Sequence, residues 1–390
     1  MDLYFEASSL YYGSDLTERT PQDQWPDSDS PVWILGNELC ARNDIAELNS
    51  EVLSRLLFTY RKEFSEIDGS GYTSDSGWGC MLRCGQMVLG EALQRISLGR
   101  DWKWDHKVDN EVDEDLKGKY LKILNLFQDS KVAPYSIHQI ALMGESIQSK
   151  KPVGTWFGPN TVAQVLKKLS FFEKTVPIRL HVAMDNTVII DEIKESCGFV
   201  GGDSEKPLLL FIPLRLGLTE INPIYFQDLK ECFEFPQILG VIGGRPNHAL
   251  YFIGYVDNEL IYLDPHISTQ SASSTVDTFG GPQDQTHHTE RAYRMDFKDL
   301  DPSLSLCFLC RNESEFEDMC ERFLFKLIRG HNSPLFEICR QRPEHLMPLP
   351  LSSSLNSDLP NAVPEEVKCA KDFVEVKRAL DTSDEEFEIL

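Results

Sequence analysis

The chain has 390 residues, of which 41% are hydrophobic and 26% are charged, so it can bury a sizeable core as one large domain or two small ones. Its formal charge of −24 argues against binding to nucleic acid or to anionic membranes and is compatible with a basic protein partner. The sequence has neither a signal-peptide pattern nor an apolar run long enough to span a bilayer, and its ten scattered cysteines predict reduced thiols in a cytoplasmic protein.

The composition divides the chain into three segments. Residues 1–30 are polar, acidic and interrupted by prolines, as in TERTPQDQWPDSD, and predict a flexible tail. Residues 31–345 remain rich in apolar residues and predict the folded region, with a long loop expected over 267–290. Residues 346–390 are Pro/Ser-rich at first and end in LDTSDEEFEIL, which predicts a disordered acidic tail with an apolar tip.

The predicted elements of the folded region are helical at first and then mainly β. Apolar residues recur at helical spacing over 80–96, and GPNTVAQVLKKLS predicts a second helix that starts at its Pro-Asn-Thr signal. The apolar run PLLLFIPL fits a buried strand. The runs ILGVIGG, HALYFIGYV and ELIYLD then predict three strands of an antiparallel meander, because short turn sequences separate them. This order of elements predicts the α+β fold class.

Cys80, in the stretch GWGCMLRCG, is the first candidate for chemistry. The positive end of a helix dipole and its unpaired N–H groups stabilise a thiolate, and the Cys80 N–H could face a developing oxyanion. Gly77 and Gly79 would allow a sharp entry into the helix. A buried packing cysteine explains this stretch equally well, since free cysteine is among the most buried residue types.

Asp264 and His266, in LIYLDPH, are the second candidate. Two residues apart at a strand end, they could form a pair in which the carboxylate orients the imidazole toward a nucleophile. Taken alone, the stretch also fits a turn that Asp264 caps, with His266 on the surface. Combined with Cys80, the catalytic interpretation is favoured. His248 is a competing base that these arguments leave open, whereas His138 fits a packed helix residue better.

Other cysteines and the C-terminus give weaker signals. Cys84 follows Cys80 by one helical turn and fits a packing role better than a redox-sensing one. Cys307 and Cys310 resemble half of a zinc site, but LSLCFLC alternates like a buried strand, so we predict no metal. The terminal EEFEIL could add as a strand to a partner's sheet edge, with Phe387 and Leu390 as anchors.

Nine segments in the same order resemble the autophagy cysteine proteases, or autophagins, over most of residues 31–345 and the last few residues. This resemblance implies a papain-like fold with a small auxiliary α/β subdomain and no cofactor. It also implies a Cys80–His266–Asp264 triad, which selects His266 over His248; the latter departs from the family pattern and is interpreted as a loop variation. The segments are FTYRKEF, GWGCMLRCGQM, SIHQIALMG, FGPNTVAQVLKKL, AMDNTV, IPLRLGL, YFIGY, LIYLDPH and EEFEIL.

The same resemblance implies how substrate is handled. Tyr60 would supply an oxyanion-side hydroxyl, although a half-buried core tyrosine is the alternative. Trp156 would cover a narrow slot that admits only glycine, next to a regulatory GGRPNH turn that contains Pro246; the alternative for Trp156 is a core anchor, and the preceding GESIQSKKPVGTW departs from the family's glycine-rich version.

The implied substrates are ubiquitin-like autophagy modifiers, free and conjugated to phosphatidylethanolamine, and the implied state is a monomer that reaches membranes through its substrate. A thiol isopeptidase acting on ubiquitin or another ubiquitin-like protein, and a non-catalytic modifier-binding scaffold, are the alternatives.

Overall fold

The computed structural model describes residues 25–105, 113–147, 150–173, 176–199, 205–272 and 275–343. The segment 346–390, with Phe387 and Leu390, lies outside the described residues, as do residues 1–24. The described part begins inside the segment that was expected to be a tail. Trp25 is buried there, and its indole N–H donates a 2.8 Å hydrogen bond to Asn49, so residue 30 is too late a start for the folded region.

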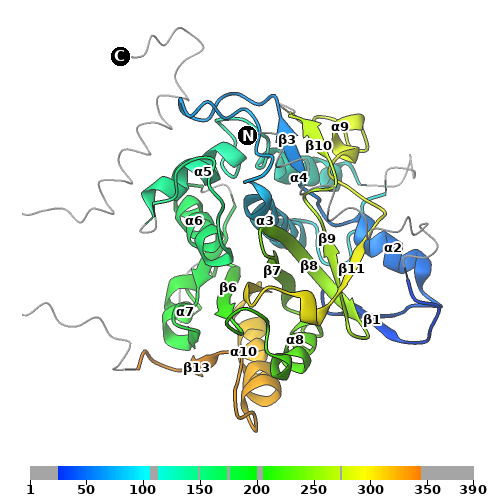
Figure 1. Cartoon of the computed structure of the whole chain (residues 1–390), viewed down its shortest axis with the longest axis vertical. Helices are drawn as coiled ribbons and strands as arrows, with labels where there is room; N and C mark the ends of the chain where they lie inside the picture. The colour runs from blue at the N-terminus through cyan, green and yellow to red at the C-terminus, as the bar shows by residue number, and fades with distance from the viewer. Residues whose placement is uncertain are drawn as a thin grey trace, which may run out of the picture.

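A nine-stranded sheet runs through the centre of the protein in the order β11-β9-β8-β7-β12-β6-β4, with β1 paired to β8 and β2 to β1 (Figure 1). The pairing is antiparallel except between β4 and β6. Two small parallel pairs, β10–β3 and β13–β5, lie outside it. The strands are β1 (Pro31–Ile34), β2 (Asn37–Cys40), β3 (Tyr60–Lys62), β4 (Arg179–Val182), β5 (Thr187–Ile189), β6 (Leu208–Arg215), β7 (Ile238–Arg245), β8 (His248–Val256), β9 (Glu259–Leu263), β10 (Thr269–Ser271), β11 (Tyr293–Asp296), β12 (Ser303–Cys310) and β13 (Glu337–Cys339).

Helices cover both faces of this sheet. One core lies between the sheet and α3, α4, α5 and α6, and the other lies between the sheet and α7, α8 and α10. The helical segments are α2 (Ile45–Leu53), α3 (Cys80–Ser97), α4 (Glu114–Asn125), α5 (Ile137–Ser146), α6 (Pro159–Phe172), α7 (Ile190–Cys197), η3 (Pro223–Tyr225), α8 (Phe226–Phe233), α9 (Pro282–Gln285), η4 (Phe297–Asp299), α10 (Glu313–Arg322) and the π-helical η5 (Phe323–Ile328).

Alternation along the strands divides side chains between the two cores. Leu209 and Phe211 of β6 join the α3 core, whereas Leu208, Leu210 and Ile212 join the opposite one. Both sides are apolar because both faces are covered, which explains the uninterrupted run PLLLFIPL.

Cys307 and Cys310 are likewise on opposite faces of β12, the first in the α3 core and the second in the other. Side chains on opposite faces of one strand cannot ligate one metal ion.

The expected helix over 80–96 is confirmed as α3, which packs against β7 and β8. The expected second helix is α6, and the meander is β7-β8-β9. A central helix packed on an antiparallel sheet confirms the α+β, papain-like expectation.

The loop expected over 267–290 is only partly correct. It contains β10, which pairs with β3, and the single turn α9. Asp284 of α9 is buried and accepts hydrogen bonds from the Trp104 indole (3.0 Å) and the Gly280 amide (2.7 Å). A buried, fully bonded carboxylate fixes this segment, which its polar composition did not predict.

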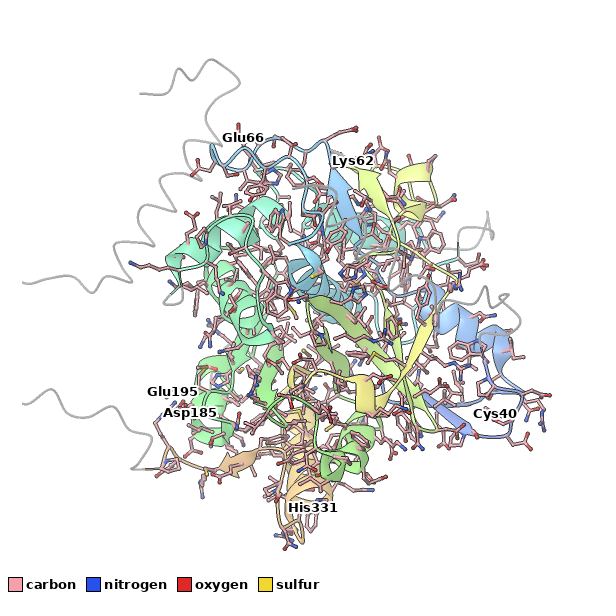
Figure 2. The ribbon with its side chains drawn as sticks, in the orientation of Figure 1. Cys40, Lys62, Glu66, Asp185, Glu195 and His331 are labelled. Carbon is pink, nitrogen blue, oxygen red and sulfur yellow. The ribbon has the colours of Figure 1, made fainter. Side chains whose placement is uncertain are left out.

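The ends of the molecule are marked by exposed side chains in Figure 2. Lys62, the last residue of β3, lies at one end, and His331 lies at the opposite end. Within the described ranges, none of the helices combines the length and apolarity needed to cross a bilayer.

Candidate active site

The turn before α3 is shaped by two glycines that act in different ways. Gly77 has a φ of +85°, a conformation that favours glycine. Gly79 has an ordinary φ, but a Cβ there would lie 2.4 Å from Oδ2 of Asp75. Only glycine therefore lets the chain pass the Asp75 carboxylate directly before Cys80, which begins the helix.

Asp75 connects the first turn of α3 to β3. Its Oδ1 accepts the Arg61 amide N–H at 2.7 Å, and its Oδ2 pairs with Nε of Arg83 at 2.7 Å. The Arg83 guanidinium also pairs with Asp129 at 2.8 Å. The side chains of Asp75, Arg83 and Asp129 are all buried. The residue after Tyr60 and the first turn after Cys80 are thus held by one carboxylate.

Asp264 and His266 lie directly after β9, in the turn that Pro265 occupies. Oδ1 of Asp264 is 2.6 Å from Nδ1 of His266 and also accepts the backbone N–H of His266 at 2.8 Å. The Asp264 carboxylate therefore caps the turn and also orients the His266 ring. The turn-capping interpretation and the ring-orienting interpretation of LIYLDPH are thus both correct in part. The His266 side chain is only 18% exposed, so the surface placement is wrong.

The Cys80 thiol and the His266 imidazole interact electrostatically, and each shifts the pKa of the other. Burial alone would raise the pKa of Cys80, but the bond to His266, its positive charge, the Ala249 backbone N–H and the Tyr60 hydroxyl together lower it. Burial lowers the pKa of His266, but Asp264 and Cys80 outweigh that effect and raise it to about 9. Both shifts are in the direction that favours a thiolate paired with an imidazolium.

The pKa of Asp264 shows the same electrostatic coupling. Burial would raise it, but the two imidazoles His248 and His266 hold it well below its usual range. Asp264 therefore stays ionised and can keep the Nδ1–H tautomer of His266 in place.

Tyr60 is buried at the start of β3, and its hydroxyl and the Cys80 thiol shift each other's pKa. Its amide donates to the carbonyl of Pro265 at 3.0 Å, and its ring packs edge-on against His266, 5.1 Å between centroids. Burial and the nearby Cys80 raise its pKa far above the ordinary value, so it remains a hydrogen-bond donor. The phenol thus faces the sulfur, as the oxyanion role requires.

His248 also belongs to this cluster, and interpreting it as a mere loop variation is wrong. It is the first residue of β8, and its ring stacks on that of His266 with centroids 3.6 Å apart and planes 13° apart. Its Nε2 lies 3.6 Å from Oδ2 of Asp264, the oxygen that His266 does not use. Sequence reasoning named the residue but did not place it against the His266 ring.

A metal ion fits this cluster poorly as it is arranged. Ligand atoms of His248, Asp264 and His266 all lie within 4.8 Å of one another. An imidazole nitrogen binds a metal ion that lies in the plane of the ring, however. The planes of the two stacked rings are nearly parallel and separated, so one ion cannot lie in both planes. The geometry is that of one carboxylate between two imidazoles.

Trp156 lies in the loop before α6, and its side chain is 40% exposed, so the core-anchor alternative is wrong. Gly154 in the same loop lies directly against the Tyr72 ring, which packs edge-on against Trp78 at 5.7 Å. The loop is thereby linked to the stretch that contains Cys80. Pro246 is exposed in the turn between β7 and β8, two residues before His248.

The other candidates lie elsewhere. His138 is fully buried in α5, with Nε2 2.6 Å from the Ser65 carbonyl, which confirms a packed helix residue. Cys84 is buried one turn beyond Cys80, and burial together with Cys80 raises its pKa well above the ordinary value. It is a poor nucleophile, in agreement with the packing role.

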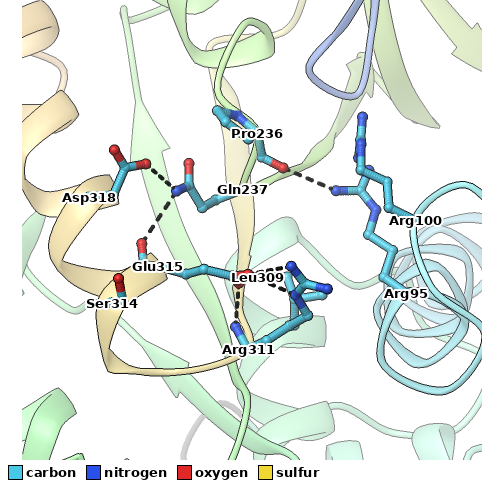
Figure 3. Close-up of a pocket in the computed structure, with 9 residues that line it drawn as sticks. All are labelled: Arg95, Arg100, Pro236, Gln237, Leu309, Arg311, Ser314, Glu315 and Asp318. Carbon is cyan, nitrogen blue, oxygen red and sulfur yellow. Dashed lines mark hydrogen bonds and ion pairs between the residues drawn. The ribbon is translucent and has the colours of Figure 1, made fainter.

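A cavity of about 450 Å³ lies at the other end of α3 and is distinct from this cluster (Figure 3). Arg95, near the C-terminus of α3, lines it, and 15 helical residues separate Arg95 from Cys80, or roughly 22 Å of helix. Its charges are largely paired: Arg311 bonds Glu315, and Arg95 bonds Glu91 outside the cavity. It contains no nucleophile beside a base.

Comparison with known proteins agrees with this chemistry. Residues 45–322 match the model of the peptidase C54 catalytic domain. The chain is 43% identical to cysteine protease ATG4B of Xenopus laevis over 99% of both chains. It is 42% identical to cysteine protease ATG4A of Gallus gallus, covering 95% of this chain and 99% of that one. It is also 42% identical to cysteine protease ATG4A of Homo sapiens over 94% and 95%.

Proposed function

Because the chain belongs to the peptidase C54 family and is a cysteine protease, we propose that Cys80, His266 and Asp264 form its catalytic triad and that it cleaves after the C-terminal glycine of ubiquitin-like autophagy modifiers. The observation that carries the triad is the 2.6 Å contact between Asp264 and the His266 ring, together with the opposite pKa shifts that Cys80 and His266 impose on each other. Nucleophile, base and orienting carboxylate in this order are the arrangement of acyl-transfer hydrolases.

The reaction proceeds in two stages. The Cys80 thiolate attacks the glycine carbonyl carbon, and the oxyanion accepts hydrogen bonds from the Cys80 N–H and the Tyr60 hydroxyl. The bond to the leaving amine breaks as imidazolium His266 protonates that amine, leaving a thioester. Water then attacks the thioester while His266 removes its proton, which releases the glycine carboxylate and the thiol.

Two leaving groups fit this one mechanism. The amine of a trailing peptide gives maturation of a modifier precursor, and the ethanolamine of a phosphatidylethanolamine head group gives release of a lipid-conjugated modifier. Both are amines that imidazolium His266 can protonate, and the lipid tails need not enter the cleft. The protein would therefore act from the cytoplasm, as a monomer, on membranes that its substrate occupies.

Substrate selection is assigned to the loop of Trp156 and to the turn of Pro246. An exposed indole beside the Cys80 stretch can close over a narrow slot, which would admit only a residue without a side chain. The tail residues Phe387 and Leu390 are proposed to dock on the modifier as an added strand.

The test is cleavage of modifier precursors that carry a C-terminal tag, and of the same modifiers conjugated to phosphatidylethanolamine in vesicles. Cys80→Ala and His266→Ala should each lose essentially all turnover, whereas Cys339→Ser, which changes a half-buried cysteine of β13, should cleave normally. A ubiquitin precursor serves as the competing substrate. Full turnover by Cys80→Ala, or faster cleavage of ubiquitin than of any autophagy modifier, would refute the proposal.

A further inference from the structure

The carboxylate of Asp264 faces two imidazoles, of which the triad uses one. Its Oδ1 is bonded to the ring and amide of His266, while its Oδ2 faces Nε2 of His248 at 3.6 Å. That distance is too long for a strong hydrogen bond but lies within ion-pair range. The Asp264 carboxylate can therefore form an ion pair with His248 when His248 is protonated.

The placement of His248 follows from the strand register. β8 and β9 pair Tyr251 with Leu263, and continuing that register past the end of β9 puts His248 opposite His266. The flat stack of the two rings, 3.6 Å between centroids, is the contact that this alignment produces. Tyr60 packs edge-on against the same His266 ring, so two aromatic side chains contact the base.

We propose that His248 is a positioning residue of the protease that shares Asp264 with His266 and, by taking up a proton at low pH, turns off the Cys80 thiolate. This inference rests on the proposed triad and extends it. Neutral His248 covers one face of the His266 ring. Protonated His248 pairs with Asp264 and repels the imidazolium.

The proton balance is simple. In the active form one proton is shared by Cys80 and His266 and resides on the imidazole. When the His248 ring takes up a proton, it and imidazolium His266 are two stacked cations beside one carboxylate. The repulsion is relieved when the proton on Nε2 of His266 moves to the Cys80 sulfur. The thiol that results is a weak nucleophile. His248 stacks directly on the His266 ring, 3.6 Å between centroids, so a positive charge on it would act on the imidazolium at contact distance.

Several charged or titratable groups surround His248. Arg245 is its cross-strand neighbour on β7, and Asp264 and His266 follow β9. Tyr262 of β9 and Tyr293 of β11 are electrostatically coupled to Asp264. Cys80 of α3 accepts the N–H of Ala249, the residue next to His248. Among these residue types, histidine is the one whose side chain commonly changes charge near neutral pH.

The test measures alkylation of Cys80 by iodoacetamide from pH 4 to 8.5 in the full-length chain, because the thiolate is the reacting species. Trypsin releases residues 63–83 as a peptide whose single cysteine is Cys80, so mass spectrometry follows this site alone. His248→Phe keeps a stacking ring without a titrating charge, and His248→Gln keeps a polar group without ring or charge.

The matched control is His331→Phe. His331 is also part-exposed and faces a buried carboxylate, Asp228, at 3.2 Å, but it lies at the opposite end of the molecule from β3 (Figure 2). It should leave the titration of Cys80 unchanged. Thermal unfolding of each variant shows whether the fold is intact.

The inference expects both His248 variants to lower the midpoint of the Cys80 titration by up to about one pH unit, since a competing cation has been removed. A midpoint that stays in place, or rises, in His248→Phe overturns the inference. Alkylation needs no substrate, so an inactive wild type against every modifier would refute the proposed function while leaving this test decisive.

Discussion

Asp264 fixes both the backbone and the ring of residue 266 through a single oxygen, which leaves His266 little freedom to rotate. A base held in this way needs no reorganisation when it receives the proton of the nucleophile. The same contact explains why the imidazolium persists to high pH: burial opposes the charge of His266, but Asp264 and Cys80 together raise its pKa to about 9.

The raised pKa of His266 predicts an alkaline limit to activity. The leaving amine must be protonated by imidazolium, so kcat/KM should fall with a midpoint at about pH 9. Folding stability should change in the same direction. The pKa of His266 in the folded chain lies above its unfolded value of about 6.5, so protonated His266 stabilises the fold fully below pH 6.5. This contribution is lost as the pH rises through about 9. The measurement is a pH profile of peptide cleavage, with tryptophan fluorescence to establish that the chain stays folded. Activity that is constant to pH 10.5 would contradict it.

The residues of the site could be predicted individually, but not all of their contacts. Cys80 at a helix start and the Asp264–His266 pair follow from spacing and local chemistry. The choice between His248 and His266 came from family resemblance. The structure shows why local reasoning could not decide: both rings face the same carboxylate, and His266 is the one whose interaction with Cys80 lowers the pKa of the thiol.

At the scale of secondary-structure elements, the register of the strands is the feature that could not be predicted from the sequence. The β8–β9 hairpin contains an irregularity between Phe252 and Gly254 that shifts the pairing by one residue. Without it, Ala249 rather than His248 would lie opposite His266. A bulge of this kind has no reliable signature in an apolar strand such as HALYFIGYV, so the sequence predicted the strands but not their alignment.

Helix α3 is buried over most of its length and nevertheless contains Arg83, one turn after Cys80. A charge in such a place predicts a buried partner, and it has two, Asp75 and Asp129. Arg83→Met should therefore lower the free energy of unfolding by about 3–5 kcal/mol, because two buried carboxylates lose their counter-charge. Urea denaturation followed by circular dichroism measures the change.

The control for that variant is Arg42→Met, which removes an exposed arginine that pairs with Asp27 and Asp29. Exposed pairs contribute little in water, so its denaturation midpoint should stay close to wild type. Equal midpoints for Arg83→Met and wild type would mean that the buried triad does not stabilise the start of α3.

For the whole molecule, two cores on opposite faces of one sheet bind the helical and β-rich parts of the chain together. Patterns of apolar residues predicted the fold class and the central helix. They did not predict that Trp25 is buried or that the polar 267–290 segment contains β10 and α9, because single side-chain hydrogen bonds, to Asn49 and to Asp284, help to fix those segments.

The C-terminal segment offers a prediction about the complete chain. Deleting residues 387–390 should weaken modifier binding about 10-fold or more, since Phe387 and Leu390 are the proposed anchors, and should leave cleavage of a short peptide unchanged. Fluorescence anisotropy with a labelled modifier measures the first, and peptide turnover the second. Glu388→Gln, between the anchors, is the control. Unaltered affinity after the deletion would exclude docking by this segment.

The position of Asp75 has a consequence for motion. Its two oxygens hold the amide that follows Tyr60 and the guanidinium one turn beyond Cys80, while the Gly79 backbone passes directly against it. The Tyr60 phenol and the Cys80 sulfur are thus connected to the same carboxylate through neighbouring residues. A displacement of the first turn of α3 would therefore move β3 with it, and the spacing between the donor and the nucleophile would be kept.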